Sequence, residues 1–92
     1  MLRTTRNRVP NNIRYYRRRA NLKLYELAHL VNNSSPANLA NWERGTKVPS
    51  LDNLLKLSEA LKVPPELLFL DRLKKIREDI RLRRALPIKK PL

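Results

Sequence analysis

The chain has 92 residues, which is enough for one domain with an added arm or helix. It contains 21 Lys and Arg against 8 Asp and Glu, and the formal charge of +13 indicates a polyanion such as nucleic acid as the partner. The absence of Cys excludes a disulfide framework and thiolate-bound metals, and a single His and a single Gly argue against metal-centred catalysis and glycine-rich phosphate loops.

The positive charge is concentrated at the two ends of the chain. Residues 1–19 contain seven Arg and no acid, residues 20–70 are neutral overall, and residues 71–92 contain nine basic and three acidic residues. We therefore expect three parts: a flexible basic arm over residues 1–10, a domain over residues 11–70, and a basic helix with a tail over residues 71–92.

The periodicity of the apolar residues is helical throughout and predicts an all-α fold. Asn11 or Asn12 can cap a first helix, and a second helix is expected over residues 23–32. After a polar turn, Ser35 and Pro36 have the pattern of an N-cap followed by proline at the first helical position, and Gly45 ends this third helix.

Two further helical segments follow a loop that ends at Pro49. Ser50 caps a fourth helix, for which we expect one apolar face made of Leu51, Leu54, Leu55, Ser58 and Leu61. A fifth segment begins near Pro65 and can continue unbroken to Arg84.

Three short helices within residues 11–44, with a tight turn between the second and the third, suggest a helix-turn-helix. The run Trp-Glu-Arg-Gly at residues 42–45, followed by Pro-Ser-Leu at residues 49–51, resembles the phage repressor and Cro type of helix-turn-helix, also called the xenobiotic-response-element family. The resemblance covers residues 11–70. It implies a compact five-helix domain that binds duplex DNA in the major groove, usually as a dimer.

The first residues of a helix that enters the major groove meet the edges of the bases. With Ser35 as the cap, these are Pro36, Ala37 and Asn38, and Asn41 lies one turn further along. Asn41 is the best candidate for reading a base, because its amide can make two hydrogen bonds to adenine. The alternative is a solvated polar residue near the end of the helix.

The resemblance also assigns residues to the DNA backbone and to the fold. It implies backbone contacts for Arg44, Thr46 and Lys47, and the helix starts at Lys23 and Ser35 can add N–H donors for phosphate. It further implies a buried ion pair that supports the fold, and this pair corresponds to Arg17 and Glu43.

The chain departs from the family pattern at several positions. Lys23 and Leu24 stand where a polar cap and Gln are common, and the turn is one residue longer, with Asn33 and Ser34. Pro36 and Ala37 cannot donate to a base edge, which reduces the expected sequence specificity and gives the basic ends a larger role.

The basic ends allow more than one interpretation. Arg3, Arg6 and Arg8 can enter a minor groove or merely add charge to a tail, and Arg14, Arg18 and Arg19 can bind phosphates or face water. In the last helix an apolar seam runs between basic flanks, and it can pack on the protein's own core or form a dimer contact; its members are Phe69, Leu73, Ile76 and Ile80. Two pairs in favourable order, Asp71–Lys75 and Asp79–Arg83, support this helix.

These observations predict a DNA-binding transcriptional regulator, a repressor of bacterial or phage origin. We expect a cytoplasmic, nucleoid-associated homodimer without cofactor, metal site or membrane partner, and no nucleophile–base pair indicates an enzyme. One alternative is an architectural or accessory DNA-binding factor of a phage or mobile element. Another is an antitoxin-like or coactivator-like adaptor whose basic C-terminal helix binds an acidic protein.

Overall fold

The computed structural model describes residues 8–31 and 35–91. Within these ranges every regular element is a helix, which confirms the all-α prediction, and none of these helices is long and apolar enough to cross a membrane. The predicted contacts of Arg3 and Arg6, and the turn with Asn33 and Ser34, lie outside the described residues. The elements in chain order are α1 (Ile13–Arg19), α2 (Leu24–Val31), α3 (Pro36–Arg44), α4 (Leu51–Leu61), α5 (Pro65–Leu68) and α6 (Leu70–Arg84).

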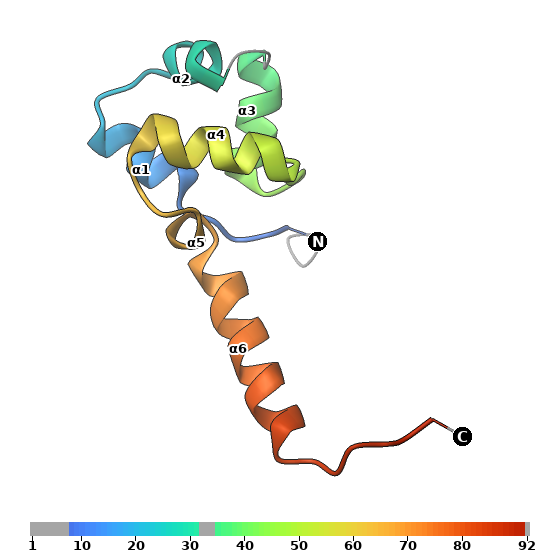
Figure 1. Cartoon of the computed structure of the whole chain (residues 1–92). Coiled ribbons are helices and arrows are strands. Elements are labelled where there is room, and N and C mark those ends of the chain that lie inside the picture. Colours follow the sequence, from blue (N-terminus) through green and yellow to red (C-terminus); the bar gives the residue numbers. More distant parts are fainter. Residues whose placement is uncertain (1–7, 32–34, 92) are drawn as a thin grey trace, which may run out of the picture.

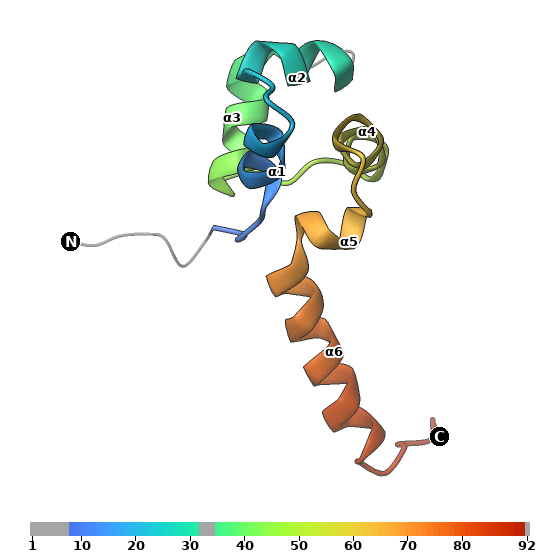
Figure 2. The same cartoon turned by 90° about the vertical axis from the view of Figure 1, so that its left-hand side faces the viewer.

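Helices α1 to α5 pack around one apolar core, and α6 leads away from it (Figures 1 and 2). Helix α2 packs against both α3 and α4, and α4 also packs against α5. Burying one large apolar side chain contributes about 1.5–3 kcal/mol. The buried residues of the core are Ile13, Leu27, Ala28, Val31, Leu39, Trp42, Leu57, Leu61 and Leu68.

The caps of α3 and α4 lie where the sequence predicts them. Ser35 Oγ accepts a hydrogen bond from the Asn38 N–H at 3.1 Å, and Ser50 Oγ accepts one from the Asn53 N–H at 3.2 Å. Each such cap contributes about 1 kcal/mol. Gly45 ends α3 with φ 79°, in the left-handed region that favours glycine.

The predicted apolar face of α4 is only partly right. Leu61 is buried and Leu54 and Ser58 are half-buried, as predicted, but Leu51 and Leu55 are exposed, and Leu57, which the predicted face leaves out, is buried. The helix carries so many Leu that two stripes fit the helical period, and the stripe that meets α2 and α5 is the one that the structure buries.

The predicted continuous helix from Pro65 to Arg84 is also wrong, because the helix breaks at Phe69, whose φ and ψ are −129° and 46°. Asn12 bonds to the carbonyls at the end of α5, which the N–H groups of the next turn would bond in a continuous helix. Its N–H donates to the Leu68 carbonyl at 2.8 Å and its Nδ2 donates to the Leu67 carbonyl at 3.1 Å. With these carbonyls occupied, the chain leaves α5 and starts α6 in a new direction.

Helix α6 contains no buried residue. Two ion pairs lie along it, Arg81–Glu78 at 2.6 Å and Arg83–Asp79 at 3.1 Å, so one of the two predicted pairs forms. Asp71 and Lys75 are not paired in the described structure. The hydrogen bonds from the Arg81 guanidinium lower the pKa of the Glu78 carboxyl from its ordinary value.

Candidate nucleic-acid interface

The outward side of α3 is the candidate reading surface. Leu39 and Trp42 are buried on the opposite side of this helix. At about 100° per residue, the centre of the outward side falls on Ala37, Ala40, Asn41 and Arg44. Ala37 and Arg44 are exposed, and Ala40 and Asn41 are half-buried.

The remaining predicted base-contact residues lie around this surface. Pro36 is exposed in the first turn of α3, and Ser35 is exposed immediately before it. Asn38 is half-buried and lies four residues before Trp42, hence on the side of the helix that turns toward the core. Ala40, in contrast, belongs to the outward side although the sequence singled out only its neighbour Asn41.

Asn41 connects α3 to the loop that follows it. Its Oδ1 accepts hydrogen bonds from Arg44 Nη2 at 2.5 Å and from Thr46 Oγ at 3.4 Å. Its carbonyl accepts bonds from the N–H groups of Thr46 at 3.1 Å and Lys47 at 3.4 Å. The loop that presents Thr46 and Lys47 to solvent is therefore fixed to the reading surface.

Arg17 and Glu43 form an ion pair between α1 and α3. Arg17 Nε lies 2.5 Å from Glu43 Oε2, Nη2 lies 3.1 Å from Oε1, and Nη1 donates to the carbonyl of Leu22 at 2.9 Å. Only 12% of the Arg17 side chain and 7% of the Glu43 side chain are exposed. The pair therefore fixes the end of α3 to α1 and to the connection before α2, and both charges are neutralised within the fold.

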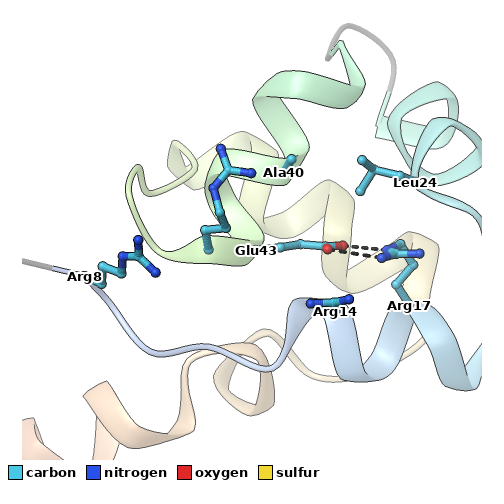
Figure 3. A pocket seen from close by; sticks show the side chains of 7 residues that line it. Arg8, Arg14, Arg17, Leu24, Ala40 and Glu43 are labelled. Atoms are coloured by element: carbon cyan, nitrogen blue, oxygen red, sulfur yellow. Dashed lines mark hydrogen bonds and ion pairs between the residues drawn. The ribbon is translucent and has the colours of Figure 1, made fainter. Parts of the chain in front are cut away.

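A basic pocket of about 550 Å³ lies beside the outward side of α3 (Figure 3). Its arginines come from three segments: Arg8 precedes α1, Arg14 lies on α1, and Arg44 ends α3. None of these three has a carboxylate partner among the described residues. The pocket is completed by Arg17, Leu24, Ala40 and Glu43.

Arg8 is held near α3 by contacts that no local pattern in the sequence indicates. The N–H of Val9 donates to the Gly45 carbonyl at 3.0 Å, and Asn11 Nδ2 donates to the Trp42 carbonyl at 2.8 Å. The approach is close enough that a Cβ on Gly45 would lie 2.4 Å from the Val9 carbonyl oxygen. The base of the arm is thus packed against the end of α3.

The arginines of α1, which the sequence alone does not distinguish, lie in different surroundings in the structure. Arg14 lines the basic pocket, whereas Arg19 lies over the ring of Tyr15, with its Cζ 5.7 Å from the ring centroid. Arg14 is thus a candidate phosphate ligand that the sequence left open, and the signal for it is its proximity to α3 in three dimensions.

The start of α2 is already occupied by an acidic side chain. Glu26 Oε1 accepts a hydrogen bond from the Lys23 N–H at 2.7 Å, which places a carboxylate at this helix start. A phosphate would be repelled there, although the exposed Lys23 side chain remains nearby. The basic pocket, in which three of the four arginines have no carboxylate partner among the described residues, is the more favourable place for a phosphate.

The seam predicted on the last helix lies away from α3. Phe69 packs against the protein's own core, Leu73 is half-buried, and Ile76 and Ile80 are 47% and 46% exposed. Of the two uses predicted for the seam, packing on the core therefore applies to Phe69 at the start of α6.

Helices α2 and α3 pack against each other over a shared core, and the outward side of α3 is uncovered and bordered by arginines; this is the arrangement of a helix-turn-helix DNA-binding protein. A comparison with protein families gives the same result: the family model described as "Helix-turn-helix" matches residues 13–68, which is more than half of the chain. The chain therefore belongs to this Cro-type, xenobiotic-response-element family. Domains of this family bind DNA, typically to regulate transcription, and are generally not catalytic. Searches among curated proteins and among solved structures found no match.

Proposed function

We propose that this protein is a transcriptional repressor that occupies a promoter with α3 in the major groove of the DNA. The observation that carries the proposal is the uncovered outward side of α3, with the basic pocket beside it and with the loop of Thr46 and Lys47 bonded to Asn41. An exposed helix with cationic side chains beside it suits a groove whose walls are phosphate backbones.

In this proposal the phosphate contacts come from the basic pocket and from the loop after α3. Arg8 and Arg14 bind phosphates from the basic pocket, and Lys47 binds a phosphate from the loop. Each phosphate that a cation neutralises adds about −0.9 to the slope of log affinity against log salt. Binding therefore weakens steeply as salt is raised.

Base reading belongs to Asn41, with Arg44 as its partner. Asn41 can pair with adenine through two hydrogen bonds only when both Oδ1 and Nδ2 are available, and Arg44 holds Oδ1 in the described structure. On DNA, Arg44 moves to a phosphate or a base and releases Oδ1. The discrimination that one such bidentate pair contributes is about 1–3 kcal/mol.

The active form in this proposal is a homodimer. Few side chains on one α3 can read bases, so two copies are needed for a site of useful length. Two copies related by a two-fold axis would place their α3 helices about 34 Å apart, one turn of the duplex, and would read an inverted repeat.

The test is selection of bound fragments from random duplex DNA, followed by footprinting of the protein's own upstream region. We expect enrichment of an inverted repeat and protection of two half-sites one turn apart. A single half-site would exclude the dimer, and no binding to any duplex at low salt would exclude the whole proposal. The variant Asn41→Ala, carried through the same selection, is the matched control, because it should lose the enriched motif and keep weak binding.

A second candidate is an architectural DNA-binding factor with little sequence preference. It is favoured by the outward side of α3 itself, since Pro36, Ala37 and Ala40 have no side-chain donor or acceptor for base edges. Uniform coverage of DNA in the footprint, together with no enriched motif in the selection, would support this candidate over the repressor.

A further inference from the structure

Helix α6 is a long surface feature that lies outside the proposed DNA interface on α3. It has 15 residues, none of them buried, and both views show it leading away from α3 (Figures 1 and 2). An isolated helix of this length is marginal in water, because most helical stability comes from a packed face. A partner that covers one side of α6 would supply such a packed face.

One side of α6 carries an apolar stripe that is open to solvent. Leu73, Ile76 and Ile80 follow one another at spacings of three and four, so they lie on one face. Nearly half of each isoleucine is exposed. This stripe is the part of the predicted seam that the protein's own core leaves uncovered.

Arginines border the apolar stripe on both edges. By helical geometry Arg72 and Arg83 lie along one edge, and Arg77 and Arg84 lie along the other. Arg77 and Arg84 also line a shallow pocket of about 360 Å³ around Ile80.

The carboxylates of α6 lie elsewhere. Asp71 and Glu78 fall on the side opposite the stripe, and Asp79 is paired with Arg83. The stripe therefore presents apolar side chains between positive charges, with no uncompensated negative charge of its own helix beside it.

We propose that α6 binds an amphipathic helix of a partner protein in which Asp and Glu flank apolar side chains. The argument is charge complementarity: such a helix covers Leu73, Ile76 and Ile80 and brings carboxylates to Arg77 and Arg84. This proposal does not depend on the proposed repressor function, because it concerns a different surface.

Three other occupants fit the surface less well. Each α6 contains seven basic and three acidic residues, which is a net charge of +4. Pairing two copies would bring these like charges together around only three apolar side chains per copy. A duplex attracts the arginines, but its phosphates gain nothing from the isoleucines. A membrane-surface helix buries a much wider apolar face than three residues provide.

The test uses the full chain and a fluorescein-labelled synthetic peptide of about four helical turns, with Leu at the a and d positions and Glu at e and g. A peptide of the same composition in scrambled order has the same charge and no apolar face. Fluorescence anisotropy should show binding to the amphipathic peptide that is tighter by about ten-fold or more than binding to the scrambled one. Equal binding of the two peptides, or no binding of either, overturns the proposal.

Two charge reversals on α6 form a matched pair. Arg77→Glu lies at the edge of the stripe, and Lys75→Glu, two residues away, lies about 200° around the helix and makes the same change in net charge. We expect Arg77→Glu to weaken peptide binding about ten-fold and Lys75→Glu to weaken it by no more than about two-fold. Equal losses would mean that only the overall charge matters, which overturns the proposal.

DNA binding of the same variants separates this inference from the DNA-binding function. Neither residue is buried, so both variants should fold, and circular dichroism checks this. Arg77→Glu should bind random duplex DNA as Lys75→Glu does. If duplex binding falls selectively in Arg77→Glu while peptide binding does not, α6 belongs to the DNA interface and the proposed partner is wrong.

Discussion

Arg17 and Glu43 are joined by two hydrogen bonds across 26 positions of sequence, and this nearly buried pair fixes the helix that carries the reading surface. The third donor of Arg17 binds the Leu22 carbonyl, so the same guanidinium also holds the connection before α2. A bidentate pair with a third bond satisfies the charge and the geometry of the guanidinium within the fold.

Loss of one charge from this ion pair should destabilise the fold. Glu43→Gln should lower the free energy of unfolding by about 3–5 kcal/mol, because it leaves the nearly buried Arg17 without an opposite charge. The double variant Arg17→Met, Glu43→Leu should recover much of that loss, since it removes both charges and keeps the volume. Urea denaturation measures both values, and a double variant that is no more stable than Glu43→Gln would contradict this account.

Substitution of Gly45 should destabilise the protein more than substitution of an ordinary helix-ending glycine. Gly45→Ala introduces strain of about 1–2 kcal/mol from the left-handed backbone, and its Cβ also collides with the Val9 carbonyl. Lys62 serves as the control, because it ends α4 in the same left-handed region, at φ 58°, but carries a side chain. Lys62→Gly should stabilise the protein by about 0.5–1 kcal/mol. The thermal midpoints of the two variants should therefore move in opposite directions, and a Gly45→Ala protein as stable as wild type would disprove the close approach.

Replacing Asn41 and replacing Lys47 should weaken DNA binding in different ways: only the effect at Asn41 should depend on the DNA sequence. Asn41→Ala should weaken binding mainly to preferred sites, whereas Lys47→Ala should weaken all sites about equally and flatten the salt slope by about one unit. Electrophoretic mobility shifts on a selected site and on random duplex, at several salt concentrations, measure both effects. Equal losses for the two variants on every sequence would remove the base-reading role from Asn41.

Arg14 and Arg18 provide a matched test of the basic pocket. Both are exposed arginines of α1, but Arg14 lines the pocket and Arg18 does not. Arg14→Gln should reduce the magnitude of the slope of log affinity against log salt by about 0.9, and Arg18→Gln should reduce it much less. If both variants give the same slope, the pocket does not hold a phosphate.

The ion pair between Glu78 and Arg81 should be visible in a titration of α6. Because hydrogen bonds from Arg81 lower the pKa of Glu78, this carboxylate supports the helix above its ordinary pKa and ceases to do so as the pH falls through the lowered value. Arg81→Gln should raise the pKa of Glu78 toward the ordinary value. A side-chain carboxyl NMR titration of both proteins measures the shift, and an unchanged pKa would contradict the pair.

The local features of the fold could be predicted because short runs of sequence determine them. Ser35, Pro36 and Gly45 mark the start and end of α3 through capping and backbone preferences, which depend on a few neighbouring residues. Leu39 and Trp42 are core positions because they share one side of that helix. The outward side of α3 follows from these two facts.

The features that were missed depend on contacts between distant residues. The approach of Val9 to Gly45 and the bonds from Asn12 to the end of α5 join segments that are far apart in sequence, and no local pattern indicates them. The predicted face of α4 is only partly right, because the leucines of this helix fit two helical stripes. Only packing against α2 and α5 decides between them.

The bonds from Asn12 to the carbonyls of Leu67 and Leu68 have a practical consequence for studies of the N-terminus. A deletion that extends through Asn12 removes positive charge and also removes the hydrogen bonds that hold the junction between α5 and α6. The effects of such a truncation on nucleic-acid binding and on partner capture would then be mixed. Shortened proteins that begin at or before Arg8 keep the two effects separate.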